Sequence, residues 1–316
     1  MSTAVATDAA QRALREGCAL VDRSEQGKLA LTGGEAKSFL SGQVTNDVEA
    51  LEAGRGQYAA LLTHKGKMLG DLRVLDTGAE LLLLCERVAL QALFDTVRRA
   101  LLGHDVQLEK RTLQRGLLSL MGPRARAVAG VTDLPAEEHA NRPAQVAGAD
   151  VLLVATDAGV DVVCLAEDTD AVRSALVVAG AVEVDEAEAE VIRVESGRPR
   201  YGVDLDDSII PQEAGLNERA VSFTKGCYVG QETVARLFYR GKPNRHLRGL
   251  RLSAPVAPGD ELRRGGKAVG RITSTAQSPV HGPIALGFVR REAAPGDTVA
   301  VGEGATTAEV VELPFS

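Results

Sequence analysis

One octapeptide, KGCYVGQE at residues 225–232, carries residue types that could do chemistry. Cys227 lies between two glycines, which allow backbone conformations closed to other residues, so we expect its thiol in a turn. Lys225 precedes it by two positions, and a nearby ammonium favours the thiolate, the nucleophilic and metal-ligating form. Three interpretations stay open: a structural cysteine in a buried turn, a reactive or ligating thiol, and a Cys–His acyl-transfer site with His64 or His246 as base.

Two acidic residues stand in unusual places. Asp71, in KMLGDLRV, is flanked by apolar residues at the start of a predicted strand. Glu195, in IRVESG, lies in the last turn of a predicted helix, where the helix dipole favours a basic residue. Each is either a surface carboxylate or a carboxylate that faces a cavity. In a cavity it would accept strong, charge-assisted hydrogen bonds from the N–H groups of a ligand.

The elements that must position these residues occur in two similar runs. Short strands separated by turns and followed by a helix are predicted at about residues 70–103 and again at about 151–180. Thr169 or Asp170 is the expected N-cap of the second helix. The repeated order of strand, turn, strand and helix indicates an α+β fold with two related lobes.

The pattern changes near the C-terminus. From about residue 247 the chain shows short strands joined by glycine-rich turns, which is typical of a small antiparallel β-barrel. An arginine-rich stretch at about 240–246 is the expected boundary. We therefore predict a core of two interleaved α+β lobes over residues 1–240 and a barrel domain over 247–316.

Composition and charge exclude several classes of function. The net charge of -7 and the pI near 5.4 oppose non-specific attraction to nucleic acids or anionic membranes. A basic cluster between Arg236 and Arg251 is either a solvated linker or an anion-binding rim. Neither a phosphate-binding P-loop nor a dinucleotide-binding glycine motif occurs.

The four cysteines are far apart and form no C-x-x-C, which argues against a zinc site, a cluster held wholly by this chain, or a disulfide scaffold. The N-terminus lacks the features of a signal peptide, and no apolar run approaches the roughly 20 residues that span a bilayer. These features predict a cytoplasmic protein.

The segment KGCYVGQETVAR closely resembles the signature of the YgfZ proteins, folate-binding proteins of iron–sulfur cluster assembly and repair that are related to the glycine cleavage T-protein. The upstream run VESGRPRYGVDLDDSIIPQEAGL resembles the same family, and Arg193, Glu195 and Gly197 match the R-x-E-x-G stretch of T-proteins. FLSGQVTNDV and HKGKMLGDLRV resemble the N-terminal landmarks of the family. By motif, the resemblance covers about residues 30–240.

The resemblance implies a GcvT-like multidomain fold: two α+β lobes around a central folate channel, followed by the small antiparallel barrel. It makes Glu195 a pterin-binding residue and Asp71 a channel carboxylate. The expected cofactor-binding set is Glu195, Asp71, Arg193, Tyr228 and Arg236, and the expected reactive set is Cys227, Lys225 and Gln231. T-proteins carry Asp-Asp-Leu where this chain has Gly-Asp-Leu, and they lack the KGCY-x-GQE motif; both departures argue against aminomethyl transfer.

The resemblance thus implies an accessory protein rather than a conventional enzyme. Such a protein would bind tetrahydrofolate or a derivative, hold no metal stably, and use Cys227 to support iron–sulfur clusters in client enzymes. Its expected partners are iron–sulfur client or assembly proteins and a folate, without direct contact to nucleic acid or membrane. Any effect on tRNA modification would be indirect, through an iron–sulfur enzyme. The alternative is a folate-dependent one-carbon (aminomethyl) transferase of the T-protein type.

Overall fold

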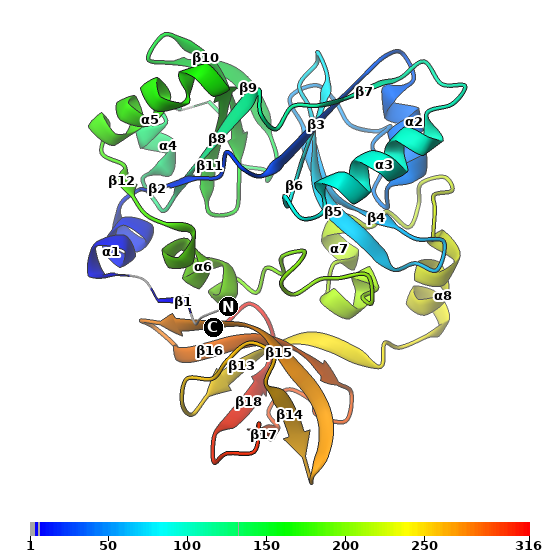
Figure 1. Cartoon of the computed structure of the whole chain (residues 1–316), viewed down its shortest axis with the longest axis vertical. Coiled ribbons are helices and arrows are strands. Elements are labelled where there is room, and N and C mark those ends of the chain that lie inside the picture. The colour runs from blue at the N-terminus through cyan, green and yellow to red at the C-terminus, as the bar shows by residue number, and fades with distance from the viewer. Residues whose placement is uncertain (1–3, 6, 132) are drawn as a thin grey trace.

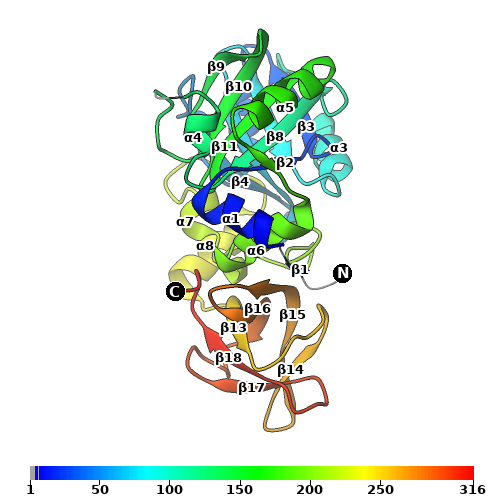
Figure 2. The same cartoon turned by 90° about the vertical axis from the view of Figure 1, so that its left-hand side faces the viewer.

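The computed structural model describes residues 4–5, 7–131 and 133–316. Two α+β lobes lie side by side, a barrel lies below them, and a layer of helices and loops connects the three (Figure 1). The same layering is visible from the side (Figure 2). Among the described residues, every helix is too short or too polar to cross a membrane.

The first lobe is an antiparallel five-stranded sheet with two helices on one face. Every residue of its central LLLLC strand is buried, because alternate side chains pack on the helices and on the second lobe. In spatial order the strands are β4 (Gly56–Leu62), β5 (Met68–Asp76), β6 (Leu81–Cys85), β3 (Gly27–Thr32) and β7 (Gln107–Lys110). The helices are α2 (Ala36–Gln43) and α3 (Leu90–Ala100).

The second lobe repeats this arrangement with a six-stranded sheet. Its order is β12 (Val182–Glu183), β2 (Ala19–Asp22), β8 (Arg115–Met121), β11 (Gly159–Leu165), β10 (Ala149–Ala155) and β9 (Asn141–Val146). Helices α4 (Ala125–Val128) and α5 (Thr169–Val178) pack on one face. Strand β2 precedes the first lobe in the chain and pairs within the second, so the lobes are interleaved.

The predicted repeat is present as β5–β6–α3 and β10–β11–α5. The prediction that Thr169 or Asp170 caps α5 is wrong by one or two residues. A short 3-10 turn, η1 (Ala166–Asp168), leads directly into the helix and makes Asp168 the N-cap. Its helix-like backbone, with φ -91° and ψ -8°, lets the turn run on into α5 without a break.

The C-terminal domain is a closed barrel of six antiparallel strands, as predicted. Strand β16 pairs with both β13 and β15, which closes the sheet, and β1 (Ala4–Val5) adds to β15 in parallel. The strands are β13 (Arg245–Leu252), β14 (Glu261–Arg264), β15 (Lys267–Ser278), β16 (Gly282–Arg290), β17 (Thr298–Val301) and β18 (Thr307–Val311).

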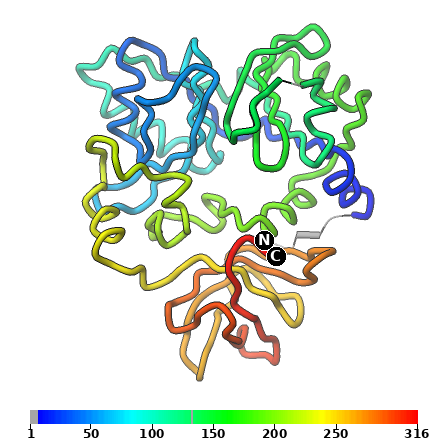
Figure 3. Tube along the Cα trace, turned by 180° about the vertical axis from the view of Figure 1, so that it is seen from behind, coloured from blue at the N-terminus to red at the C-terminus, as the bar shows by residue number. Residues whose placement is uncertain are grey.

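A connecting layer separates the lobes from the barrel (Figure 2). It contains α1 (Asp8–Glu16), α6 (Glu186–Glu195), η2 (Pro211–Ala214), α7 (Asn217–Ala220) and α8 (Gln231–Arg240). Helix α8 was not predicted, and Val234 is its single buried residue. From behind, the segment that contains α8 runs down the side of the first lobe toward the barrel (Figure 3).

Helix α6 joins this layer to the barrel through its last turn. Its N-terminus has a capping box, in which the Asp185 side chain accepts from the Glu188 N–H at 2.7 Å and the Glu188 carboxylate accepts from the Asp185 N–H at 3.2 Å. Gly197, with φ 65°, follows the last turn, so the helix ends where the sequence predicts.

The Arg193 guanidinium is the main polar link between α6 and the barrel. It donates to both carboxylate oxygens of Glu190, to Asp204 at 2.7 Å, to the Ser274 hydroxyl at 2.7 Å, and to the Arg198 carbonyl. These bonds use every N–H of the guanidinium. Asp204 also accepts from the Ser274 hydroxyl at 2.7 Å.

We expect Asp204→Asn to destabilise the protein by about 3 kcal/mol, because it removes the fully buried carboxylate and leaves Glu190 as the single acid paired with the Arg193 guanidinium. Urea unfolding monitored by circular dichroism measures the loss. Asp170→Asn is the matched control, since Asp170 also pairs with an arginine but its side chain is 89% exposed. The control should cost less than about 1 kcal/mol. Equal losses in the two variants would contradict this account of the network.

Candidate functional site

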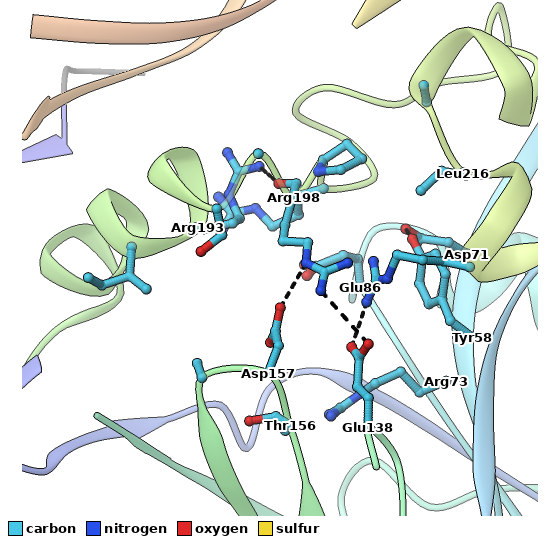
Figure 4. Close-up of a pocket in the computed structure, with 18 of the residues that line it drawn as sticks. Tyr58, Asp71, Arg73, Glu86, Glu138, Thr156, Asp157, Arg193, Arg198 and Leu216 are labelled. Atoms are coloured by element: carbon cyan, nitrogen blue, oxygen red, sulfur yellow. Dashed lines mark hydrogen bonds and ion pairs between the residues drawn. The ribbon is translucent and has the colours of Figure 1, made fainter. Parts of the chain in front are cut away.

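A cavity of about 820 Å³ lies where the two lobes meet the connecting layer (Figure 4). The first lobe contributes side chains from β4, β5 and the end of β6, and the second from β8 and β11. The C-terminal end of α6 and residues 196–200 form another wall. Its buried and half-buried charged residues are Arg23, Asp71, Arg73, Glu86, Glu138, Asp161, Glu186, Arg193, Arg198, Arg200, Arg219 and Arg248.

Tyr58 and Asp71 form the polar centre of the first-lobe wall. Neighbouring strands β4 and β5 place them together, and the Tyr58 hydroxyl donates a short hydrogen bond to Asp71 Oδ2. Burial raises the pKa of Asp71 to about 6, although the Tyr58 hydrogen bond and the Arg219 charge act in the opposite direction. The Arg219 guanidinium lies 4.9 Å from the centre of the Tyr58 ring. Asp71 is thus a buried acceptor facing the cavity, in mid-strand rather than at the strand start.

Opposed charges on the two lobes pair across the cavity. Arg73 of β5 contacts Asp161 of β11 at 2.6 Å, and the Ser119 hydroxyl donates to the same carboxylate at 2.6 Å. Burial would raise the pKa of Asp161, but the Arg73 charge and these hydrogen bonds outweigh it and lower that pKa. The pair therefore ties the lobes together as well as lining the cavity.

The remaining charges form a chain along the cavity (Figure 4). Arg219 contacts Glu138 at 2.5 Å, and Arg198 reaches Glu138 at 3.8 Å and Asp157 at 2.7 Å. Each of these charged groups is satisfied by another protein group, which restricts how it could move toward a ligand.

Glu86 differs from these acids. It follows β6 directly and is half-buried, and its carboxylate makes no hydrogen bond or ion pair with any residue the structure describes. Burial is the largest cause that raises its pKa to about 7; the Asp71 charge raises it further, and the Arg200 charge lowers it. Sequence reasoning missed both Glu86 and Tyr58. The available signals were an acid directly after an apolar strand and a tyrosine in a strand of small apolar residues.

Cys227 lies in a second, separate groove of about 400 Å³, and no residue lines both hollows. Its thiol is exposed, whereas the other three cysteines are buried. Ser38, Asp47 and Glu49 form the facing wall. No histidine lines this groove, so a Cys–His arrangement with His64 or His246 is not present. Within the described residues, three or more His, Cys, Asp or Glu side chains nowhere gather as a metal site.

The Lys225 side chain holds the Cys227 loop against the end of α2, within the groove that Cys227 lines. Its ammonium donates to the carbonyls of Val44 at 2.9 Å, Asn46 at 3.0 Å and, through a shorter bond, Ser41. Carbonyls at a helix C-terminus lack intrahelical partners, and α2 ends just here. Burial lowers the pKa of Lys225 to about 8.

Tyr228 and Gln231 also shape this loop. The Tyr228 ring is buried 5.1 Å from the Lys225 ammonium, and the Gln231 N–H donates to the Tyr228 carbonyl at 3.3 Å where α8 begins. Arg236 is exposed on α8. Tyr228 and Arg236 therefore lie outside the central cavity, contrary to the expectation that they bind the cofactor.

Two further members of the expected cofactor-binding set are corrected. Glu195 does not line the cavity: its Oε1 accepts from Arg15 at 2.5 Å and from the Ser278 hydroxyl at 2.6 Å. Arg193 lines the cavity, but every N–H of its side chain is already bonded within the protein. Of the predicted set, Asp71 alone presents an available polar side chain to the cavity.

Known proteins share this architecture and part of the sequence. Residues 2–225 match the family model described as the GCVT N-terminal domain, and residues 245–316 match the glycine cleavage T-protein C-terminal barrel domain. An aminomethyltransferase of Thermus thermophilus is 31% identical, over 96% of this chain and 88% of its own length. A chloroplastic protein of Arabidopsis thaliana is 28% identical, over 98% of this chain and 73% of its own length.

A solved structure shares the whole arrangement. The crystal structure of the glycine cleavage system aminomethyltransferase T from Bartonella henselae superimposes with a TM-score of 0.87 at 25% identity. The match covers 98% of this chain and 89% of that chain.

The opposite pKa shifts of Asp71 and Asp161 predict opposite pH effects. The native pKa of Asp71, about 6, exceeds the unfolded value of about 3.9, so ionising it weakens the folded state as pH rises between them. Relative to wild type, Asp71→Asn should gain about 2 kcal/mol of unfolding free energy from pH 4 to pH 7. Relative to wild type, Asp161→Asn should instead lose unfolding free energy over that range. The lowered pKa of Asp161 in the native protein stabilises wild type at pH values above the pKa of this group in the unfolded chain.

Urea unfolding of the three proteins at several pH values checks this prediction. The two differences from wild type should diverge with increasing pH. Parallel curves would show that Asp71 is not buried as described.

Proposed function

The chain belongs to the glycine cleavage T-protein family, and from this premise we propose a folate-binding accessory protein that supports iron–sulfur clusters in client enzymes. The observation that carries the proposal is the separation of two sites. A cavity lined by charged and apolar side chains suits a small molecule, and an exposed cysteine lies in a separate groove.

The cavity fits a reduced folate. Its volume of about 820 Å³ lies within the roughly 300–1,000 Å³ range of small-molecule pockets. A pterin is rich in N–H groups, and Asp71 supplies a buried acceptor for them. The glutamate part of folate is anionic. Arg200 and Arg248 line the cavity, and each would exchange its present carboxylate partner, Glu186 or Glu312, for that of the ligand. The folate itself would supply one-carbon or redox chemistry when bound.

The exposed Cys227 loop is suited to contact with a partner protein. Its thiol is exposed at the N-terminal side of α8, so a second protein can reach it. One thiolate supplies one cluster ligand, and further ligands would come from an iron–sulfur client or assembly protein. The same thiolate could attack a partner disulfide, forming a mixed disulfide and releasing the partner's second thiolate.

A second candidate is a folate-dependent aminomethyl transferase. Two observations favour it: relatives from several bacteria are aminomethyltransferases, and the Tyr58–Asp71 pair provides a carboxylate beside any bound folate. This function would need Asp71 and would not need Cys227, since the thiol lies outside the cavity.

Folate binding tests the shared part of both functions. Purified protein should bind tetrahydrofolate, and Asp71→Asn should raise the dissociation constant roughly 10- to 100-fold, as expected for loss of a charged acceptor. Glu195→Gln is the matched control and should leave the affinity unchanged, because Glu195 contacts Arg15 and Ser278 instead of the cavity. Isothermal titration calorimetry under anaerobic conditions gives both values. A larger effect at Glu195 than at Asp71 would place the ligand elsewhere.

Complementation tests the part played by the thiol. In cells that lack the protein, a cluster-dependent enzyme is assayed under oxidative stress after restoring wild type, Cys227→Ser or Ser38→Ala. The thiol variant should leave activity at the level of the deficient cells, because serine cannot ligate a cluster or exchange disulfides. Ser38→Ala changes the same groove without touching the thiol and should rescue fully.

The outcomes separate the two candidates. Rescue by Cys227→Ser together with failure of Asp71→Asn would favour the transferase. In that case, formation of methylene-tetrahydrofolate from an aminomethyl donor becomes the direct assay.

A further inference from the structure

Glu86 is a half-buried acid without a protein partner in a cavity whose other buried acids are paired. Asp71 accepts from Tyr58, Glu138 from Arg219, and Asp161 from Arg73. Glu86 lines the same cavity and makes no such contact among the described residues. Figure 4 shows its carboxylate within the cavity, in the same region as Asp71 and Arg198.

The nearest cations are committed to other acids. Arg23 contacts Glu186 at 2.8 Å, and Arg200 contacts Glu186 at 3.3 Å and Glu190 at 3.4 Å. Both arginines act on Glu86 only through longer-range attraction. Its carboxylate oxygens are therefore available to a ligand, and only as acceptors while the group is ionised.

A ligand N–H group can donate to this acceptor, which no protein group satisfies. Burial raises the pKa of Glu86 to about 7. The cavity thus presents two carboxyl groups, Asp71 and Glu86, that favour a ligand with N–H groups and disfavour one with bare ring nitrogens.

We propose that Glu86 makes the cavity selective for the reduced form of its ligand, by accepting hydrogen bonds from N–H groups that only the reduced ring carries. Tetrahydrofolate has N–H groups at N5 and N8, whereas folic acid has unprotonated aromatic nitrogens there. A carboxylate attracts the former and repels the lone pairs of the latter. This inference rests on the proposed function, since it names the form of the folate.

Protonation of Glu86 should make the affinity for each ligand depend on pH. Ligand N–H donors stabilise the ionised carboxylate, so tetrahydrofolate should bind more tightly as pH rises through 7, where Glu86 loses its proton. Folic acid should show the reverse, because a protonated carboxyl can donate to a bare nitrogen. The charged groups that face Glu86 are Asp71 on β5, Arg23 after β2, and Glu186 and Arg200 at the two sides of α6. Asp71, with its pKa near 6, adds a second pH dependence at lower pH.

The test compares tetrahydrofolate with folic acid on wild type, Glu86→Gln and Glu218→Gln, by anaerobic calorimetry from pH 6 to pH 8.5. Wild type should prefer tetrahydrofolate, and Glu86→Gln should reduce that preference roughly 10-fold or more, chiefly by weakening tetrahydrofolate binding. It should also lose the pH dependence near 7. Glu218, an exposed acid at the cavity edge, controls for the charge change, and its variant should retain both properties.

Thermal melts of the three proteins establish that each is folded. If wild type binds tetrahydrofolate and Glu86→Gln keeps the wild-type preference, the assignment of Glu86 is wrong and the folate function stands. If Glu218→Gln loses the preference equally, general cavity charge is responsible and the assignment is also wrong. If wild type binds neither ligand, the proposed function fails and this inference fails with it.

Discussion

The buried ion pair between Arg193 and Asp204 fixes the geometry on which the cavity depends. Asp204 is fully buried and accepts from Thr273 and Ser274 of the barrel, so the pair joins the end of α6 to a different domain. The chain leaves α6 at this point and immediately forms one wall of the cavity. A buried charge pair holds its position because separating the partners leaves an uncompensated charge in a weakly polar interior. The barrel domain therefore supports the site and also lines part of it, through residues 247–248 and 312–314.

The charged side chains of the cavity are of two kinds. Arg73 with Asp161 and Arg219 with Glu138 are satisfied by one another and define walls that resist rearrangement. Glu86, together with the outward side of Asp71, remains to be satisfied by a ligand. Rigid walls and a few unsatisfied groups are the combination that lets a cavity select a ligand by its pattern of donors.

The thiol groove and the cavity are separate, yet they share one support. Lys225, beneath the Cys227 loop, donates to the Asn46 carbonyl, and the Asn46 side chain donates to the carbonyls of Tyr58 at 2.9 Å and Arg219 at 3.3 Å. The loop that presents the thiol and the wall that presents Tyr58 are thus anchored to the same residue. The KGCYVGQE segment consequently has a structural part, Lys225 and Tyr228, as well as an exposed chemical part, Cys227.

The sequence alone determined the two-lobed α+β fold, the C-terminal barrel and the relation to the glycine cleavage T-protein, because apolar periods, turn residues and contiguous motifs are local properties. It also singled out Asp71, as an acid within an apolar strand. Only the tertiary structure decided which polar groups face the cavity. Glu195 and Arg193 occupy matching motif positions, but Ser278 and Ser274 of the barrel, far away in the chain, accept from or donate to their side chains. No sequence motif marks Glu86. Its carboxylate is unpaired because of the way the three parts of the molecule pack around it.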